Sequence, residues 1–80
     1  DLLSWVMGRA KADDVWLTVM GNINAIAVAT LADVSAIVLV EDAVLDEEAR
    51  ARANQQEVAV YAASLPAYET ALQIAAALAE

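Results

Sequence analysis

Residues 23–40, INAIAVATLADVSAIVLV, limit what this chain can fold into, because they carry a single charged side chain, Asp33. A segment this apolar must be buried in the protein, in an assembly or in lipid. The whole chain has only 80 residues, and a chain of that size buries only about 60% of its unfolded surface when it folds alone. We therefore expect a partner to complete the burial of this segment.

Large apolar side chains recur at spacings of three and four residues along 14–40, which is typical of a helix with one broad apolar face. They are Trp16, Met20, Ile23, Ala27, Leu31, Val34 and Val38. The opposite side of such a helix holds small or polar side chains, among them Ala25, Ala29 and Asp33. The sequence thus predicts an apolar helix over 14–40, with a break expected near residue 21 or residue 33.

The same stretch has an alternative interpretation as a β-meander over 15–40, which would make the fold α+β. The segments VWLTVM, INAIAVATL and VSAIVLV could be strands, with Gly21 and Asn22 in a tight turn between the first two. Alternation of apolar and polar residues is poor, however, and alanine, which strands disfavour, is dense. We therefore favour the helix.

The rest of the chain predicts two further helices and a short arm. Residues 1–12 form an N-terminal arm that carries Trp5, residues 43–63 an amphipathic helix with an acidic start, and residues 66–79 a C-terminal helix with Pro66 in its first turn. The last two helices would form an αα-hairpin. The predicted fold is a single domain, 1–80, all-α with three to four helices, elongated and completed by assembly.

Composition excludes several kinds of chemistry. The chain has no cysteine and no histidine, which removes disulfides, thiolate nucleophiles, most zinc and iron sites and any Ser-His-Asp catalysis. A formal net charge of −8 disfavours nucleic acid and anionic lipid as partners. The acidic run of Asp42, Asp46, Glu47 and Glu48 is interpreted as a solvated helix start rather than a cation site. We expect no enzyme, no cofactor and no catalytic or metal residues.

Asp33 is the most distinctive polar residue. It could be a proton or ion site if the apolar segment spans a membrane, for which 15–40 is long enough to cross about 30 Å of hydrocarbon. It could equally be a polar contact along the seam of small residues, or the cap of a helix that restarts at Val34. A small accessory subunit of a membrane complex is therefore one alternative function.

Two segments resemble helices of phage-repressor-like helix-turn-helix domains. PAYETALQIAAAL, 66–78, is similar to the final helix of such domains, and NQQEVAVYAA, 54–63, resembles their second helix. The resemblance implies a DNA-binding or regulatory module. The chain lacks the recognition helix between these segments and the glycine of the turn, so this function is kept as the first alternative, ahead of the membrane subunit.

The favoured function is that of a non-catalytic structural subunit in a virion, tail or pilus-like assembly, with other protein subunits or copies of itself as partners. The aromatic residues are expected to be core or interface anchors, since no basic residues alternate with them. Localisation is not predicted beyond membership of an assembly. The predicted interface residues are Trp5, Trp16, Met20, Ile23, Ala25, Ala29, Leu31, Asp33, Val34 and Val38.

Overall fold

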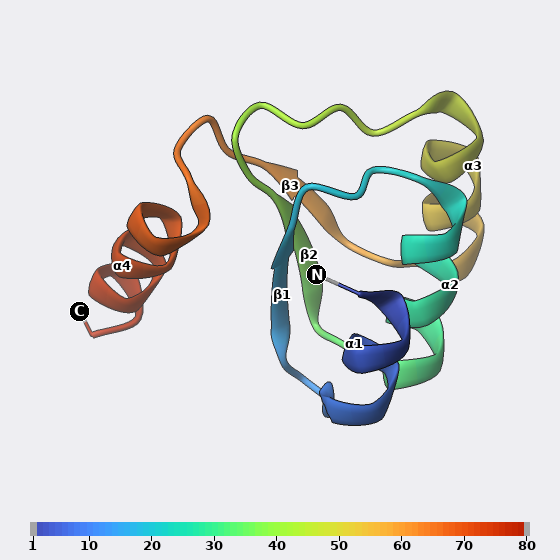
Figure 1. Cartoon of the computed structure of the whole chain (residues 1–80), viewed down its shortest axis with the longest axis horizontal. Helices are drawn as coiled ribbons and strands as arrows, with labels where there is room; N and C mark the ends of the chain where they lie inside the picture. The colour runs from blue at the N-terminus through green and yellow to red at the C-terminus, as the bar shows by residue number, and fades with distance from the viewer. Residues whose placement is uncertain (1, 80) are drawn as a thin grey trace.

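Helices and strands alternate along the chain in the computed structural model, which describes residues 2–79. Figure 1 shows one layer of strands with helices to either side. The elements are α1 (Leu3–Arg9), β1 (Val15–Thr18), α2 (Ile23–Ala32), β2 (Ala36–Leu39), α3 (Glu47–Gln56), β3 (Val60–Ala62) and α4 (Ala67–Leu78).

The three strands form one parallel sheet in the order β1-β2-β3. Trp16 pairs with Ile37 across β1 and β2, and Ile37 pairs with Val60 across β2 and β3. Helix α2 connects the first two strands and α3 connects the second pair, so the chain forms two successive βαβ units.

Both crossover helices lie on the same face of the sheet. The strands follow one another in a single direction across the sheet, and βαβ crossovers are nearly always right-handed, so the two crossovers must pass on the same side. Figure 1 shows α2 and α3 together on one side of the strands and α4 on the other. The topology thus leaves the second face of the sheet to α4 alone.

The all-α prediction was wrong, because residues 15–40 form a strand, a helix and a second strand instead of one apolar helix. The meander alternative was also wrong in its topology, since β1 and β2 are parallel and separated by α2. All four residues of β2 are buried. A parallel strand covered on both faces is a continuous apolar run without alternation. The missing alternation is why the helix was favoured, although the alternative had correctly placed strands within VWLTVM and VSAIVLV.

Helix α2 occupies the interval between the two predicted breaks. The Asn22 side chain accepts a hydrogen bond from the Ala25 N–H over 3.0 Å and caps the helix start. At the other end Asp33 adopts a left-handed conformation, with φ 58°. Asp33 therefore ends α2, and the expectation that it caps a new helix at Val34 was wrong.

Helix α3 is shorter than the predicted helix at 43–63. It begins after Asp46, whose carboxylate accepts from the Ala49 N–H over 2.8 Å, and it ends at Glu57 in a left-handed conformation. Strand β3 follows, so the predicted αα-hairpin was wrong. The segment 54–63 that resembled a helix-turn-helix second helix is the end of α3, a turn and β3.

The core lies between the sheet and the two crossover helices. Trp16 and Ile37 from the sheet pack with Ile26 of α2 and Ala49 of α3, and each of the four is at most 7% exposed. The radius of gyration is 12.0 Å and the principal extents are 32 × 24 × 22 Å. A compact chain of this length is expected at about 12 Å, so the predicted elongation was wrong.

The two ends of the chain follow the predictions more closely. Helix α4 lies inside the predicted range 66–79, with Pro66 as its N-terminal cap residue. Helix α1 lies inside the predicted arm and packs against α2. Within residues 2–79, no helix has the length and apolar character that a membrane span requires.

Candidate functional site: an apolar groove on the open face of the sheet

The sheet has two apolar faces, and only one of them is covered by the crossover helices. Successive side chains of a strand point to opposite faces. Trp16 and Ile37 belong to the core, so their neighbours along the strands point away from it. We call this second surface the open face; it is formed by Val15, Leu17, Ala36, Val38 and Tyr61.

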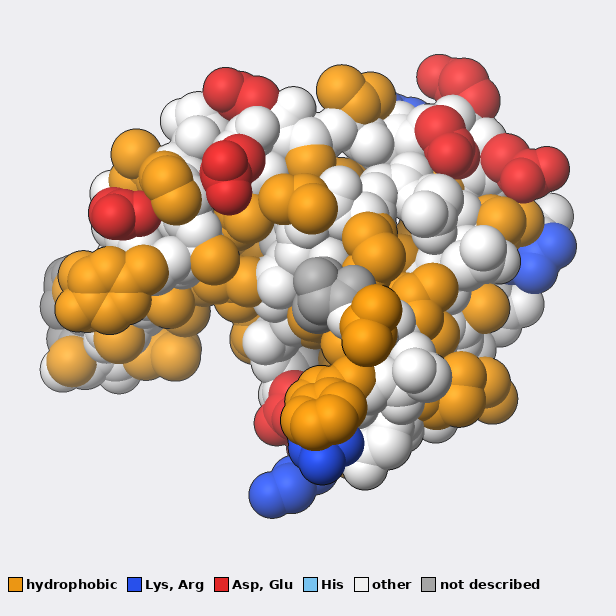
Figure 2. All heavy atoms as spheres, in the orientation of Figure 1, with side chains coloured by type: hydrophobic (Ala, Val, Ile, Leu, Met, Phe, Trp, Pro, Cys, Tyr) orange, Lys and Arg blue, Asp and Glu red, His pale blue; other side chains and the backbone are white. Residues whose placement is uncertain are grey.

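Helix α4 stands over the open face and leaves a groove between itself and the strands. The groove has a volume of about 430 Å³. Figure 2 shows α4 as an apolar lobe with an open notch separating it from the rest of the molecule. Its lining residues are Val15, Ser35, Ala36, Val38, Tyr61, Ala63, Thr70 and Ile74.

One backbone carbonyl fixes the start of α4 relative to the sheet. The Leu65 carbonyl accepts a hydrogen bond from the Glu41 N–H over 3.0 Å and another from the Thr70 hydroxyl over 3.1 Å. The first bond joins the loop after β3 to the loop after β2, and the second joins α4 to the same point. Thr70, a polar residue only 5% exposed, therefore sets how α4 leaves the sheet.

The groove contains hydroxyl groups but no charged side chain. Ser35, Tyr61 and Thr70 supply the hydroxyls, and the other lining residues are apolar. An apolar pocket with a few polar groups can accept either a protein surface or an apolar ligand. Occupation of this groove would bury no charge, since none of its lining residues is Asp, Glu, Lys or Arg.

Apolar side chains remain exposed along the sides of the groove. Val38 at its centre is 7% exposed, whereas Val15 on β1 is 42% exposed and Tyr61 on β3 is 62% exposed. On α4 itself, Tyr68 is 71% exposed and Leu72 is 51% exposed. Among the strands, α4 lies closest to β1, and Val15 on β1 and Tyr61 on β3 both keep much of their surface exposed.

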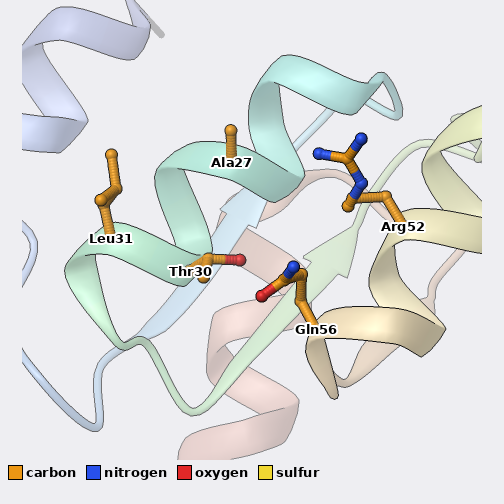
Figure 3. A pocket seen from close by; sticks show the side chains of 5 residues that line it. All are labelled: Ala27, Thr30, Leu31, Arg52 and Gln56. Atoms are coloured by element: carbon orange, nitrogen blue, oxygen red, sulfur yellow. The ribbon is translucent and has the colours of Figure 1, made fainter.

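A second, smaller cleft lies between the outer surfaces of α2 and α3. It has a volume of about 200 Å³ and is lined by Ala27, Thr30, Leu31, Arg52 and Gln56. Figure 3 shows Gln56 and Arg52 reaching from α3 toward α2. The Thr30 hydroxyl donates to the Ile26 carbonyl over 2.9 Å, so its proton is used within the helix. This cleft has half the volume of the groove.

The acidic run behaves as a helix start. Glu47 and Glu48 occupy the first turn of α3, where the helix dipole favours negative charge, and Asp46 caps it. Asp42 lies in the preceding loop with φ 58°. Among residues 2–79, no group of three or more Asp and Glu side chains is placed to hold a metal ion.

The predicted interface residues are divided among separate surfaces, since 14–40 is not one helix. Trp16, Ala25 and Ala29 are buried in the core, with Met20 and Val34 packed against it in part. Ile23 is half-buried in the first turn of α2, and Asp33 is exposed at its end. Leu31 is 74% exposed beside the second cleft. Of the ten residues, only Val38 lines the groove.

Trp5 lies apart from the groove on α1. It is 58% exposed, and the Arg9 guanidinium stands over its ring at 3.4 Å from the ring centroid. This is a cation–π contact one helical turn apart along the sequence. Trp5 therefore lies on a surface and is not part of the core.

Val15 and Tyr61 are exposed groove residues that the predicted interface omitted. Val15 and Tyr61 reach one face only through the pairing of each outer strand with β2. The available signal was local and weak: β1 begins directly after Asp14, and β3 begins three residues after Glu57. Comparisons of the chain with protein-family models, with curated proteins and with solved structures found no match.

Proposed function

We propose that this chain is a non-catalytic assembly subunit whose open face packs against another protein subunit. One observation carries the proposal. The sheet is parallel, its open face is apolar, and both edge strands of that face remain exposed at Val15 and Tyr61.

Parallel sheets occur almost only with both faces covered, because their strands are apolar on both sides. Here α2 and α3 cover one face, whereas α4 covers the other only in part and leaves Val15 and Tyr61 largely exposed. Burying a large apolar side chain contributes roughly 1.5–3 kcal/mol. Completing the cover over Tyr61 and its neighbours is therefore a strong driving force for association.

The chemistry of the groove also indicates what kind of partner it suits. Its lining has no charged side chain, so the matching surface is apolar. Nucleic acid is a poor candidate, since the formal net charge of −8 repels phosphate. Strand β3 also occupies the place where the helix-turn-helix alternative requires helix. A protein surface with exposed aliphatic or aromatic side chains fits best.

Thiol labelling tests this proposal cleanly, because the chain has no cysteine of its own. Tyr61→Cys places a thiol on the open face, and Gln55→Cys places a control thiol on the exposed side of α3. We expect position 61 to react at least tenfold more slowly than position 55 at about 100 µM protein, where stable assemblies form. Light scattering under the same conditions should give a mass above the 8.4 kDa of one chain.

Two outcomes contradict the proposal. Equal labelling rates together with a single-chain mass would mean that the open face stays uncovered. Slow labelling at position 61 with a single-chain mass would mean that a small apolar molecule fills the groove, whose volume of about 430 Å³ lies in the range of ligand pockets.

A further inference from the structure

Helix α4 is held against the sheet by few contacts. Of its twelve residues only Thr70 is buried, and Ile74 is half-buried. Among the strands it lies closest to β1. Figure 1 shows α4 set apart from the strands, whereas α2 and α3 pack with them into the core. An element with so little buried apolar contact opens more readily than the rest of a domain.

The connection between β3 and α4 is anchored as far as Leu65. The Ala63 N–H donates to the Leu39 carbonyl over 2.8 Å, and the Leu65 carbonyl accepts from the Glu41 N–H over 3.0 Å. Beyond this point, the hydrogen bonds of α4 among the described residues stay inside the helix or return to the segment just before it. The hinge about which α4 can turn therefore lies at Leu65 and Pro66.

Helix α4 stands in the way of any partner that covers the whole open face. Val15 and Tyr61 lie on opposite edge strands, and Val38 lies between them on β2. Ile74 of α4 lines the groove together with all three. A single partner surface can reach both edges and the centre only when α4 no longer stands over the sheet.

We infer that α4 is a hinged cover, which turns away from the sheet about Leu65 and Pro66 while the rest of the fold stays intact, and that the partner subunit binds the open face in this turned-away state. Helix α4 and the partner thus compete for one surface. The inference rests on the proposed assembly function and adds its control. The apparent dissociation constant of the partner is raised in proportion as the turned-away population becomes smaller.

Two alanine substitutions in α4 form a matched pair. Ile74→Ala removes most of a side chain that lines the groove, and it keeps a strong helix former in the helix. Leu72→Ala removes a side chain of the same size about half a turn round the helix, where Leu72 is 51% exposed. Only the first should favour the turned-away state, and circular dichroism should show both variants folded.

A thiol at position 38 measures the release of α4. Val38 lines the groove and is 7% exposed, so Val38→Cys should react slowly while α4 is in place. At about 1 µM protein, far below the concentration used for assembly, Ile74→Ala should speed this labelling about tenfold, and Leu72→Ala should leave it unchanged. Equal labelling rates in the two variants would overturn the inference.

Urea separates release of α4 from unfolding of the whole chain. A local opening exposes little surface, so the labelling rate at position 38 should depend only weakly on urea below the unfolding transition. A dependence as steep as that of global unfolding would overturn the inference. Hydrogen exchange of the wild-type chain gives the same information without a thiol. The amides of α4 should exchange at least about tenfold faster than those of α2 and α3, and equal protection would contradict the hinge.

Light scattering tests the competition with the partner. Ile74→Ala enlarges the turned-away population, so its apparent dissociation constant for association should be about tenfold lower than that of the wild type, which Leu72→Ala should match. Association of Ile74→Ala no tighter than that of the wild type would overturn the inference and leave the assembly function standing. A mass of 8.4 kDa for all three chains, with position 61 freely labelled, would overturn the assembly function and with it the competition.

Discussion

Asp33 and Glu57 hold the same left-handed backbone conformation at the ends of α2 and α3, with φ of 58° in both residues. In each case the next residue is a valine whose N–H donates back to a carbonyl of the helix. Val34 donates to Ala29 over 3.3 Å and Val58 donates to Ala53 over 2.9 Å. The two crossover helices therefore end in the same way before a parallel strand.

This equivalence predicts that Glu57→Gly stabilises the chain. A residue with a β-carbon is strained in the left-handed region, and a carboxylate at a helix C-terminus opposes the helix dipole. We expect the free energy of unfolding to rise by about 1 kcal/mol. Asp33→Gly should give a smaller rise, since aspartate tolerates this conformation better than glutamate.

Urea denaturation at low protein concentration measures both changes. Glu57→Ala is the matched control, because it removes the charge and keeps the β-carbon; it should give less than half of the gain. An equal gain in Glu57→Ala and Glu57→Gly would show that the backbone conformation is not the cause.

Substitution by alanine is expected to have opposite effects on stability at the two glycines, Gly21 and Gly8. A β-carbon on Gly21 would overlap the Val44 carbonyl oxygen, and the Gly21 carbonyl accepts from the Asp46 N–H over 2.9 Å. Gly21→Ala should therefore lower the free energy of unfolding by about 2 kcal/mol or more, through displacement of the loop before α3.

Gly8→Ala is the control for this effect. Gly8 lies within α1, and a β-carbon there would meet no atom within 4 Å. Alanine favours a helix over glycine by about 0.5–1 kcal/mol, so this variant should be slightly more stable than the wild type. Thermal unfolding of the two variants side by side gives the comparison. Similar midpoints would mean that the loop at residues 21 and 44 is not closely packed.

Salt should strengthen self-association through the open face. Each copy carries a formal net charge of −8, whereas no charged side chain lines the groove. Screening thus removes repulsion between the copies without breaking an ion pair. Between about 20 mM and about 500 mM sodium chloride we expect the dissociation constant to fall severalfold, measured by sedimentation equilibrium. A rise would indicate that ion pairs hold the copies together.

How far the sequence predicts this structure differs from one element to the next. Helix α4 was predictable because Pro66 marks its start and its apolar period is helical. The boundaries of α2 were predictable at Asn22 and Asp33, where residues suited to helix ends interrupt the apolar run. Local chemistry determines both features.

The α+β alternative placed strands in the segments VWLTVM and VSAIVLV, where β1 and β2 lie, but local pattern did not favour it over the helix and gave no sign of β3. Strand β2 is buried on both faces, so Ala36 to Leu39 show no alternation of apolar and polar residues. Only pairing with β1 and β3 makes this run a strand. The place of Tyr61 in the groove was not predictable for the same reason. Tyr61 lies on one surface with Val15 and Val38 only because the strands pair in this order.

The most direct test of the central claim is an isotope-filtered nuclear Overhauser experiment on a mixture of labelled and unlabelled chains. Packing through the open face predicts contacts between the Tyr61 ring of one copy, which is 62% exposed in a single chain, and an apolar side chain of another copy. Contacts between copies that involve Leu31 of α2 and not Tyr61 would contradict the claim that the open face is the interface.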